Sequence, residues 1–161
     1  MDFDLLLTLL QILISLIGGA IGAATWVRFF RKKETRLFKN IQRPIGIIST
    51  SDMSLQHEAT LLKRVGFFNV EAPSFDVRAI DVLDDKRLVI IGYTPKSKEF
   101  KEVFLAAKQR SIPVIVYSGP ARIEPDDMAM LQGYSHHSMC NTPLRLVSDV
   151  FALMSTYPED K

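Results

Sequence analysis

An unbroken apolar segment near the N-terminus restricts what this chain can fold into. Leu5 to Val27 covers 23 positions without an ionisable side chain. A helix of that length spans ~34 Å, slightly more than the ~30 Å hydrocarbon core of a bilayer. The segment follows Asp2 and Asp4 and is longer than the apolar core of a secretory signal. The sequence therefore predicts a transmembrane anchor over residues 1–30, with a buried hydrophobic hairpin as the alternative.

A dense cluster of basic side chains follows the apolar segment. From Arg28 to Arg43 the chain has seven basic residues and one acid, Glu34, so the local net charge is +6. Residues 44–161 have a net charge of −2, so the basicity of the chain resides in this segment. We expect residues 31–43 to be a basic juxtamembrane linker. Each charge contributes about 1 kcal/mol near anionic lipid headgroups, whereas nothing here favours nucleic acid as a partner.

The position of this cluster also predicts the orientation in the membrane. Basic residues close to a membrane helix remain on the cytoplasmic side. We therefore expect a single-pass protein of the cell inner membrane whose C-terminal domain is cytoplasmic. The lone Cys140 has no partner for an internal disulfide, which agrees with a reducing compartment.

Small residues within the apolar segment favour contact between membrane helices. Ser15, Gly19 and Ala23 recur at four-residue spacing, as do Gly18 and Gly22. Such faces allow helix backbones to approach closely in lipid. Tethering to a membrane also raises the effective concentration of the attached domain. The pattern predicts a homo-oligomer.

From Pro44 onward, short apolar runs alternate with amphipathic segments. The runs predict strands, the segments predict helices, and Ser54 and Thr94 are candidate helix N-caps. Five βα units with short loops predict an α/β fold, a five-stranded parallel flavodoxin-like sheet with helices on both faces. This domain covers residues 44–157 and is followed by a tail, 158–161. Strands are expected over 45–49, 67–71, 87–92, 112–118 and 134–140, with helices over 54–65, 77–83, 94–107, 125–131 and 143–154.

Four stretches of this domain resemble the receiver (CheY-like) domain of two-component response regulators. They are LLKRVGFFNVEAP at 61–73, LVIIG at 88–92, IPVIVYS at 112–118, and Thr142-Pro143. The third ends in Ser118, where receivers place a switch Ser or Thr, and the fourth stands where receivers have Lys-Pro. The resemblance covers Pro44 to Thr156 and implies the receiver fold.

The residues that receivers use for phosphorylation are replaced. The acidic pair after the first strand is replaced by Ser49, Thr50 and Ser51, the phosphoacceptor Asp by Gly92, and the Lys by Thr142. Magnesium binding and aspartyl phosphorylation both need carboxylates, so we expect neither. The resemblance then implies a degenerate pseudo-receiver that signals or assembles through protein contacts. Residues 125–154 correspond to the face through which receivers dimerise, and an unidentified cytoplasmic protein is the expected partner.

A second resemblance, to TIR domains, leaves a different function open. Ile48-Ser49 resembles the opening strand of that family, and the stretch from Tyr93 to Glu102 resembles its catalytic region. Glu102 is then the candidate catalytic residue of a nucleotide-sensing or NAD-cleaving membrane effector, as in bacterial defence. The Trp-Cys that usually precedes this Glu is missing, and the stretch between the first and third strands is short. We therefore favour a protein that is not an enzyme.

Polar residues at the strand ends predict a ligand-binding rim. Parallel sheets bind ligands at the carboxyl ends of their strands. Hydroxyls and free helix N-termini suit an anion or a nucleotide better than a divalent cation. The alternative is that these residues cap helices and form turns. No metal site is expected, because the adjacent His136 and His137 face opposite sides of a strand, and no cofactor motif occurs. The rim candidates are Ser49, Thr50, Ser51, Tyr93, Thr94, Ser118 and Thr142.

Overall fold

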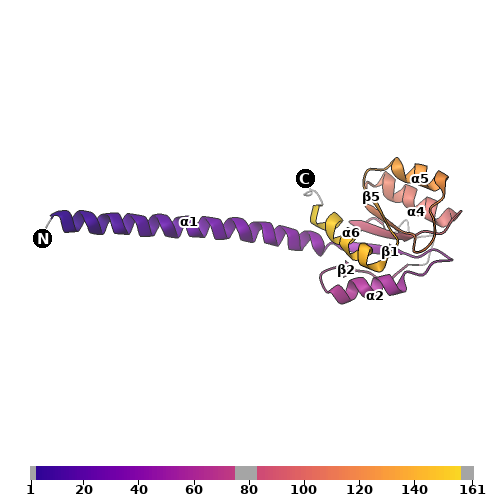
Figure 1. The fold of residues 1–161 in the computed structure, drawn as a ribbon, viewed down its shortest axis with the longest axis horizontal. Coiled ribbons are helices and arrows are strands. Elements are labelled where there is room, and N and C mark those ends of the chain that lie inside the picture. The colour runs from indigo at the N-terminus through magenta and orange to yellow at the C-terminus, as the bar shows by residue number, and fades with distance from the viewer. Residues whose placement is uncertain (1–2, 75–82, 157–161) are drawn as a thin grey trace. The chain divides into compact units, whose positions relative to one another are not determined.

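The chain forms a long N-terminal helix and an α/β domain (Figure 1). The computed structural model describes residues 3–74 and 83–156. Residues 1–39 and 40–161 form two compact units. The short helix predicted over 77–83 lies outside the described residues, except for Leu83.

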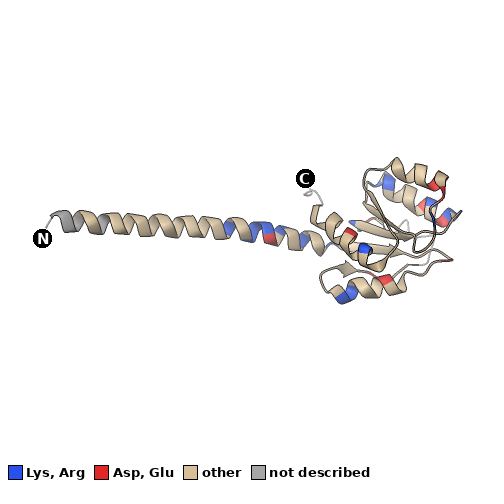
Figure 2. Ribbon diagram, viewed as in Figure 1, with Lys and Arg blue, Asp and Glu red and all other residues tan. Residues whose placement is uncertain are grey.

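Helix α1 (Phe3–Ile41) includes both the apolar segment and the basic segment that follows it. By length and composition, it is the one helix among the described residues that is able to cross a membrane. Figure 2 shows that its Lys and Arg residues gather in the half of the helix that follows the apolar run. The predicted basic linker is therefore helical as far as Ile41.

Five parallel strands form one sheet with the order β2-β1-β3-β4-β5. The central pairs are in a continuous register, in which Ile47 lies beside Ile90 and Ile90 beside Ile115. This strand order is flavodoxin-like and confirms the predicted fold class. The strands are β1 (Pro44–Ile48), β2 (Asn69–Val70), β3 (Leu88–Gly92), β4 (Val114–Tyr117) and β5 (His137–Cys140).

Helices cover both faces of the sheet, and each face has its own apolar core. Successive side chains of a strand point to opposite faces. Ile90 and Ile115 therefore join the core with α2 (Gln56–Val65) and α6 (Pro143–Thr156). Ile91 and Val116 join the other core, with α4 (Lys98–Gln109) and α5 (Pro125–Gln132). The apolar runs of the sequence are apolar at every position because both faces of these strands are buried.

Two predicted helix caps are wrong, because the tertiary structure uses other hydroxyls. Helix α2 has Leu55 at its N-cap with no side-chain cap, and Leu55 N–H donates to Ser49 Oγ at 3.0 Å, so Ser54 does not cap. Helix α4 starts three residues later than Thr94-Pro95 suggests, and Ser97 caps it by accepting from Phe100 N at 3.2 Å. A single sequence does not show which of several nearby hydroxyls the tertiary structure uses.

Two leucines on α6 provide a matched test of the two-layer core. Leu146 is fully buried, whereas Leu144 is 79% exposed. We expect Leu146→Ala to lower the free energy of unfolding by about 2–5 kcal/mol, because it leaves a cavity. Leu144→Ala should change it by about 0.5 kcal/mol or less. Urea denaturation of both variants measures the difference, and equal losses would contradict this placement of α6.

Candidate functional site at the ends of the strands

The loop between β1 and α2 folds back over the carboxyl ends of the central strands. Thr50 and Met53 exchange two backbone hydrogen bonds of 3.1 Å, which close the loop. Ser49 is 4% exposed, and its hydroxyl accepts from the N–H of Leu55. The resulting turn places Met53 and Leu55 next to the end of β3.

Gly92 ends β3 beneath this turn. A Cβ atom at this position would lie 3.4 Å from the carbonyl oxygen of Met53 and 3.6 Å from Leu55 Cδ1. A carboxylate extending from that Cβ would approach a carbonyl oxygen and an apolar side chain, and both are unfavourable neighbours for a negative charge. The space in which a larger side chain at position 92 would stand is therefore lined by the protein's own loop.

The rim hydroxyls next to Gly92 bind one another. Thr50 Oγ1 and Thr94 Oγ1 are hydrogen-bonded at 2.9 Å. The N–H of Ser51 donates to Glu99 Oε2 at 3.1 Å, which joins the β1–α2 loop to the first turn of α4. The structure thus brings together the predicted rim residues of β1 and β3, and several of their polar groups are engaged with each other.

Tyr93 is a buried structural link. It is 1% exposed, and its hydroxyl donates to Asp127 Oδ2 and accepts from the N–H of Glu124, both at 2.9 Å. Asp127 is also buried, and it accepts from Lys101 Nζ at 3.0 Å. Burial raises the pKa of Tyr93, the Glu124 N–H opposes the rise, and the Asp127 charge adds to it. These contacts tie α4 and α5 to the end of β3 and engage the Tyr93 hydroxyl as both donor and acceptor.

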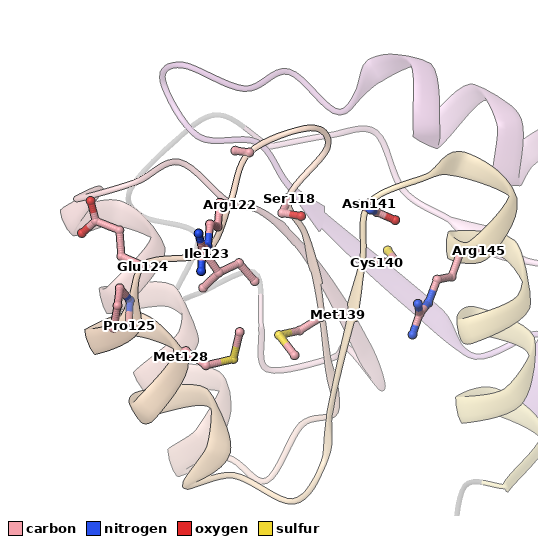
Figure 3. Close-up of a pocket in the computed structure, with 11 residues that line it drawn as sticks. Ser118, Arg122, Ile123, Glu124, Pro125, Met128, Met139, Cys140, Asn141 and Arg145 are labelled. Atoms are coloured by element: carbon pink, nitrogen blue, oxygen red, sulfur yellow. The ribbon is translucent and has the colours of Figure 1, made fainter.

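A groove lies between α5 and α6 at the free edge of the sheet (Figure 3). Its volume is about 880 Å³. Met128 of α5 and Met139 of β5 point toward each other across it, and Arg145 projects from α6. Of the predicted rim residues only Ser118 lines it; the other six do not. The lining consists of Ser118, Ala121, Arg122, Ile123, Glu124, Pro125, Met128, Met139, Cys140, Asn141 and Arg145.

The groove combines an apolar floor with charged walls. Methionine side chains adapt to differently shaped apolar groups. Arg122 is exposed on the loop before α5, and Arg145 makes a long, exposed ion pair of 3.8 Å with Asp149. Ser118 is 8% exposed, and its hydroxyl has a weak contact of 3.5 Å with the carbonyl of Gly119. The groove thus presents apolar side chains together with two cationic side chains and one carboxylate, that of Glu124.

Thr142 has the role of a helix cap. Its hydroxyl accepts from the N–H of Arg145 at 3.4 Å, and its carbonyl accepts from Leu146 at 3.0 Å. The prediction that the last helix begins at position 143 is confirmed. Thr142 and Ser118 lie at the ends of β5 and β4, so the predicted rim separates into a β1–β3 part and a β4–β5 part.

Cys140, which also lines the groove, and Tyr117 are buried in the core that contains α2 and α6. Burial raises the pKa of the Cys140 thiol to about 12, with Asp149 adding to the rise and Arg145 opposing it. Burial and a hydrogen bond to the buried Glu58 raise the pKa of Tyr117 to about 12. The reactive form of a cysteine is the thiolate, so Cys140 is an apolar core residue in this fold.

Residues considered for metal binding or catalysis stand apart from one another. Among the described residues, no group of three or more His, Cys, Asp and Glu side chains is placed to hold a metal ion. His136 packs edge-on against Tyr134 at 5.6 Å between ring centroids, and His137 Nδ1 is hydrogen-bonded to the Tyr134 carbonyl. Glu102 is exposed on α4 and does not line the groove.

Comparison with known proteins shows the fold of the domain. The chain is similar in structure to the receiver domain of the Francisella response regulator 1452, with a TM-score of 0.53 and 13% sequence identity. The alignment covers 70% of this chain and 97% of that receiver domain. No protein-family model and no curated protein matches the chain. The receiver-like, CheY-like fold predicted from the sequence is confirmed.

The buried thiol gives a direct test of this geometry. We expect Cys140 in the native protein to react with a water-soluble disulfide reagent at least ~100-fold more slowly than in the unfolded chain, because a pKa rise of this size removes almost all thiolate at pH 8. Ser148→Cys adds an exposed thiol on α6 that should react fast. Equal rates for the two thiols would contradict the burial.

The raised pKa of Cys140 also predicts the direction in which the stability of the fold changes with pH. The folded state holds the proton of Cys140 more tightly than the unfolded state, so this contribution is complete below about pH 9 and is lost as the pH rises toward about 12. The contribution of Tyr117 to stability is likewise lost as the pH rises from about 10 toward about 12.

Proposed function

We propose that this protein is a membrane-tethered, receiver-like module that signals or assembles through protein contacts without aspartyl phosphorylation. Helix α1 is the anchor, and the α/β domain is the cytoplasmic part that meets other proteins. The observation that carries the proposal is the end of β3, where Gly92 lies under the Met53 carbonyl and the Leu55 side chain.

The β1–α2 loop supports the absence of phosphoryl chemistry. Magnesium is held by carboxylates and water, and an aspartyl phosphate needs a carboxylate nucleophile. At the corresponding positions this chain has Ser49 to Ser51, and the Ser51 N–H is bound by Glu99. Asp52, the nearest acid in the loop, is exposed.

The surface beside the β4–β5 part of the rim supports the proposed contact with other proteins. The groove between α5 and α6 presents apolar and cationic groups together. On α6, Leu144 and Phe151 are 79% and 46% exposed and lie two turns apart on one side of the helix. Exposed apolar side chains beside a polar rim mark protein-interaction sites. This surface lies within residues 125–154, where the receiver resemblance puts the dimerisation face.

Membrane tethering completes the proposal. The basic residues of α1 suit the cytoplasmic leaflet with its anionic lipids, which keeps the domain in the cytoplasm. Confinement of the domain to a surface promotes encounters between copies, and the small residues of the apolar segment allow close helix contact. A homo-oligomer at the inner membrane is the state we propose.

Acetyl phosphate tests the chemical half of the proposal. We expect the full-length protein in detergent, with magnesium, to form no acyl phosphate, while an ordinary receiver domain treated in parallel becomes labelled. Asp52→Asn is the matched variant, because Asp52 is the one acid in the loop that replaces the acidic pair. Labelling that disappears in Asp52→Asn would show that the loop acid accepts phosphate and would defeat the proposal.

Photo-crosslinking tests the contact surface. A photoreactive phenylalanine analogue replaces either Phe151 on α6 or Leu105 on α4, two apolar side chains that are each 46% exposed. In cell membranes we expect a crosslinked protein species from position 151 and at least ~10-fold less from position 105, because a specific interface covers one patch of the surface. Equal yields from both positions would contradict the proposed surface.

A further inference from the structure

The part of α1 beyond the apolar segment has most of its basic residues on one side. We call residues 28–39 the stalk. At ~100° per residue, Phe30 and Leu37 lie on one face of the helix, with Val27 directly before them. The opposite face has four of the basic residues of the stalk, which are Arg28, Lys32, Arg36 and Lys39.

The apolar face of the stalk is uncovered. Val27, Phe30, Leu37 and Phe38 are 48%, 43%, 39% and 53% exposed. Phe29 differs from them, because the Lys33 ammonium lies 4.5 Å above its ring. Each Å² of apolar surface that stays in water instead of being buried costs about 25 cal/mol of free energy. A helix of this composition is stable in water when another surface covers the face.

The lipid surface does not reach Leu37 and Phe38, the part of this face beyond the predicted anchor. An interfacial helix lies in the membrane plane with its apolar side ~5–10 Å deep in the headgroup region. Helix α1 is continuous, and residues 23–42 contain neither Gly nor Pro, the usual causes of a sharp bend. A helix that spans the bilayer and continues straight places Leu37 about 15 Å beyond the apolar segment.

We propose that the stalk pairs in parallel with the stalk of a second copy of this chain, as a short two-stranded coiled coil. Val27, Phe30, Glu34 and Leu37 follow one another at spacings of three, four and three residues, which is the heptad pattern of such pairs. A second copy carries the same apolar face at the same height above the membrane. This inference deepens the assembly proposed above by naming its contact.

The charges of the stalk agree with this pairing. Its one acid, Glu34, lies in the middle of the heptad face, and Lys33 and Arg31 stand on either side of that face. In a parallel pair, equivalent residues at this heptad position lie side by side, so the two Glu34 carboxylates approach each other, and each also lies beside Lys33 of the second copy, whose charge offsets the repulsion. A polar residue at such a position fixes the register of the two helices. The other basic residues point away from the contact.

The surface of α1 has small residues beside Val27. A shallow, open recess lies on α1 at the start of the stalk. It is lined by Ala23, Ala24, Val27, Arg28 and Arg31. In a coiled coil, each apolar side chain enters a hole formed by residues of the facing helix. The two alanines leave such a recess beside Val27.

The heptad also continues into the membrane. Leu16, Ala20 and Ala23 extend the same spacing toward the N-terminus. A seven-residue repeat gives a left-handed crossing, whereas the Gly18/Gly22 spacing favours a right-handed one. Two membrane helices that cross at a right-handed angle move apart beyond the membrane. A paired stalk therefore selects the heptad face of the membrane helix over the glycine face.

Cysteine crosslinking of the full-length protein in isolated membranes tests the pairing. Single cysteines replace Val27, Phe30 or Leu37 on the heptad face and Arg28, Lys32 or Lys39 on the opposite face. Under mild oxidation we expect the first three to form disulfide-linked dimers at least ~10-fold faster than the other three, because two cysteines bridge only within ~7 Å between Cα atoms. The parent chain is the blank, since its Cys140 is buried.

Each other outcome overturns the inference. Equal rates around the helix, or faster crosslinking on the basic face, would exclude the heptad contact. Cysteines at 30 and 37 that form no disulfide and are also shielded from a water-soluble maleimide would assign this face to lipid. Failure here leaves the acetyl phosphate and position 151 results unaffected, so the stalk and the receiver-like domain are tested separately.

Discussion

Burial of the central strands on both faces is the constraint on which the domain depends. All five residues of β3 are buried, and the residues of β4 are as well. A strand in this position must be apolar throughout and must be covered by helices on both sides. The chain therefore needs amphipathic helices between its strands, and the right-handed crossover then fixes a doubly wound sheet whose strand ends share one edge.

That same constraint explains which parts of the fold the sequence predicts. The run LVIIG and the run IPVIVYS identify β3 and β4, because double burial leaves a clear apolar signal. The second strand is predicted over five residues, but β2 has only two. It is an edge strand, and its length is set by the two residue pairs that it forms with β1. The cap predictions are wrong for a related reason. The hydroxyl of Ser49, at the end of β1, accepts a hydrogen bond from Leu55 at the start of α2, and only the fold brings that hydroxyl there.

The candidate site likewise has some features that the local sequence pattern predicts and others that only tertiary contacts create. The sequence finds the hydroxyls at the strand ends, because they follow directly after apolar runs. It does not reveal that Tyr93 is bound by Asp127 and Glu124, or that Met53 and Leu55 stand over Gly92. Asp127 has no sequence signal beyond an acid in the first turn of a helix. The groove between α5 and α6 is likewise formed by segments that are separate in sequence.

The junction between α1 and the domain gives the proposed pairing its consequence. Ile41, the last residue of α1, is 6% exposed within the core of the domain, and only Gln42 and Arg43 separate it from β1. Two paired stalks would hold two domains at a high effective concentration. A weak contact through α6 is then sufficient for assembly. Conversely, a partner that binds α6 more strongly than the second copy does would separate the domains without removing them from the membrane. In the proposed arrangement the membrane helix would supply proximity, and the receiver-like surface would supply the choice of partner.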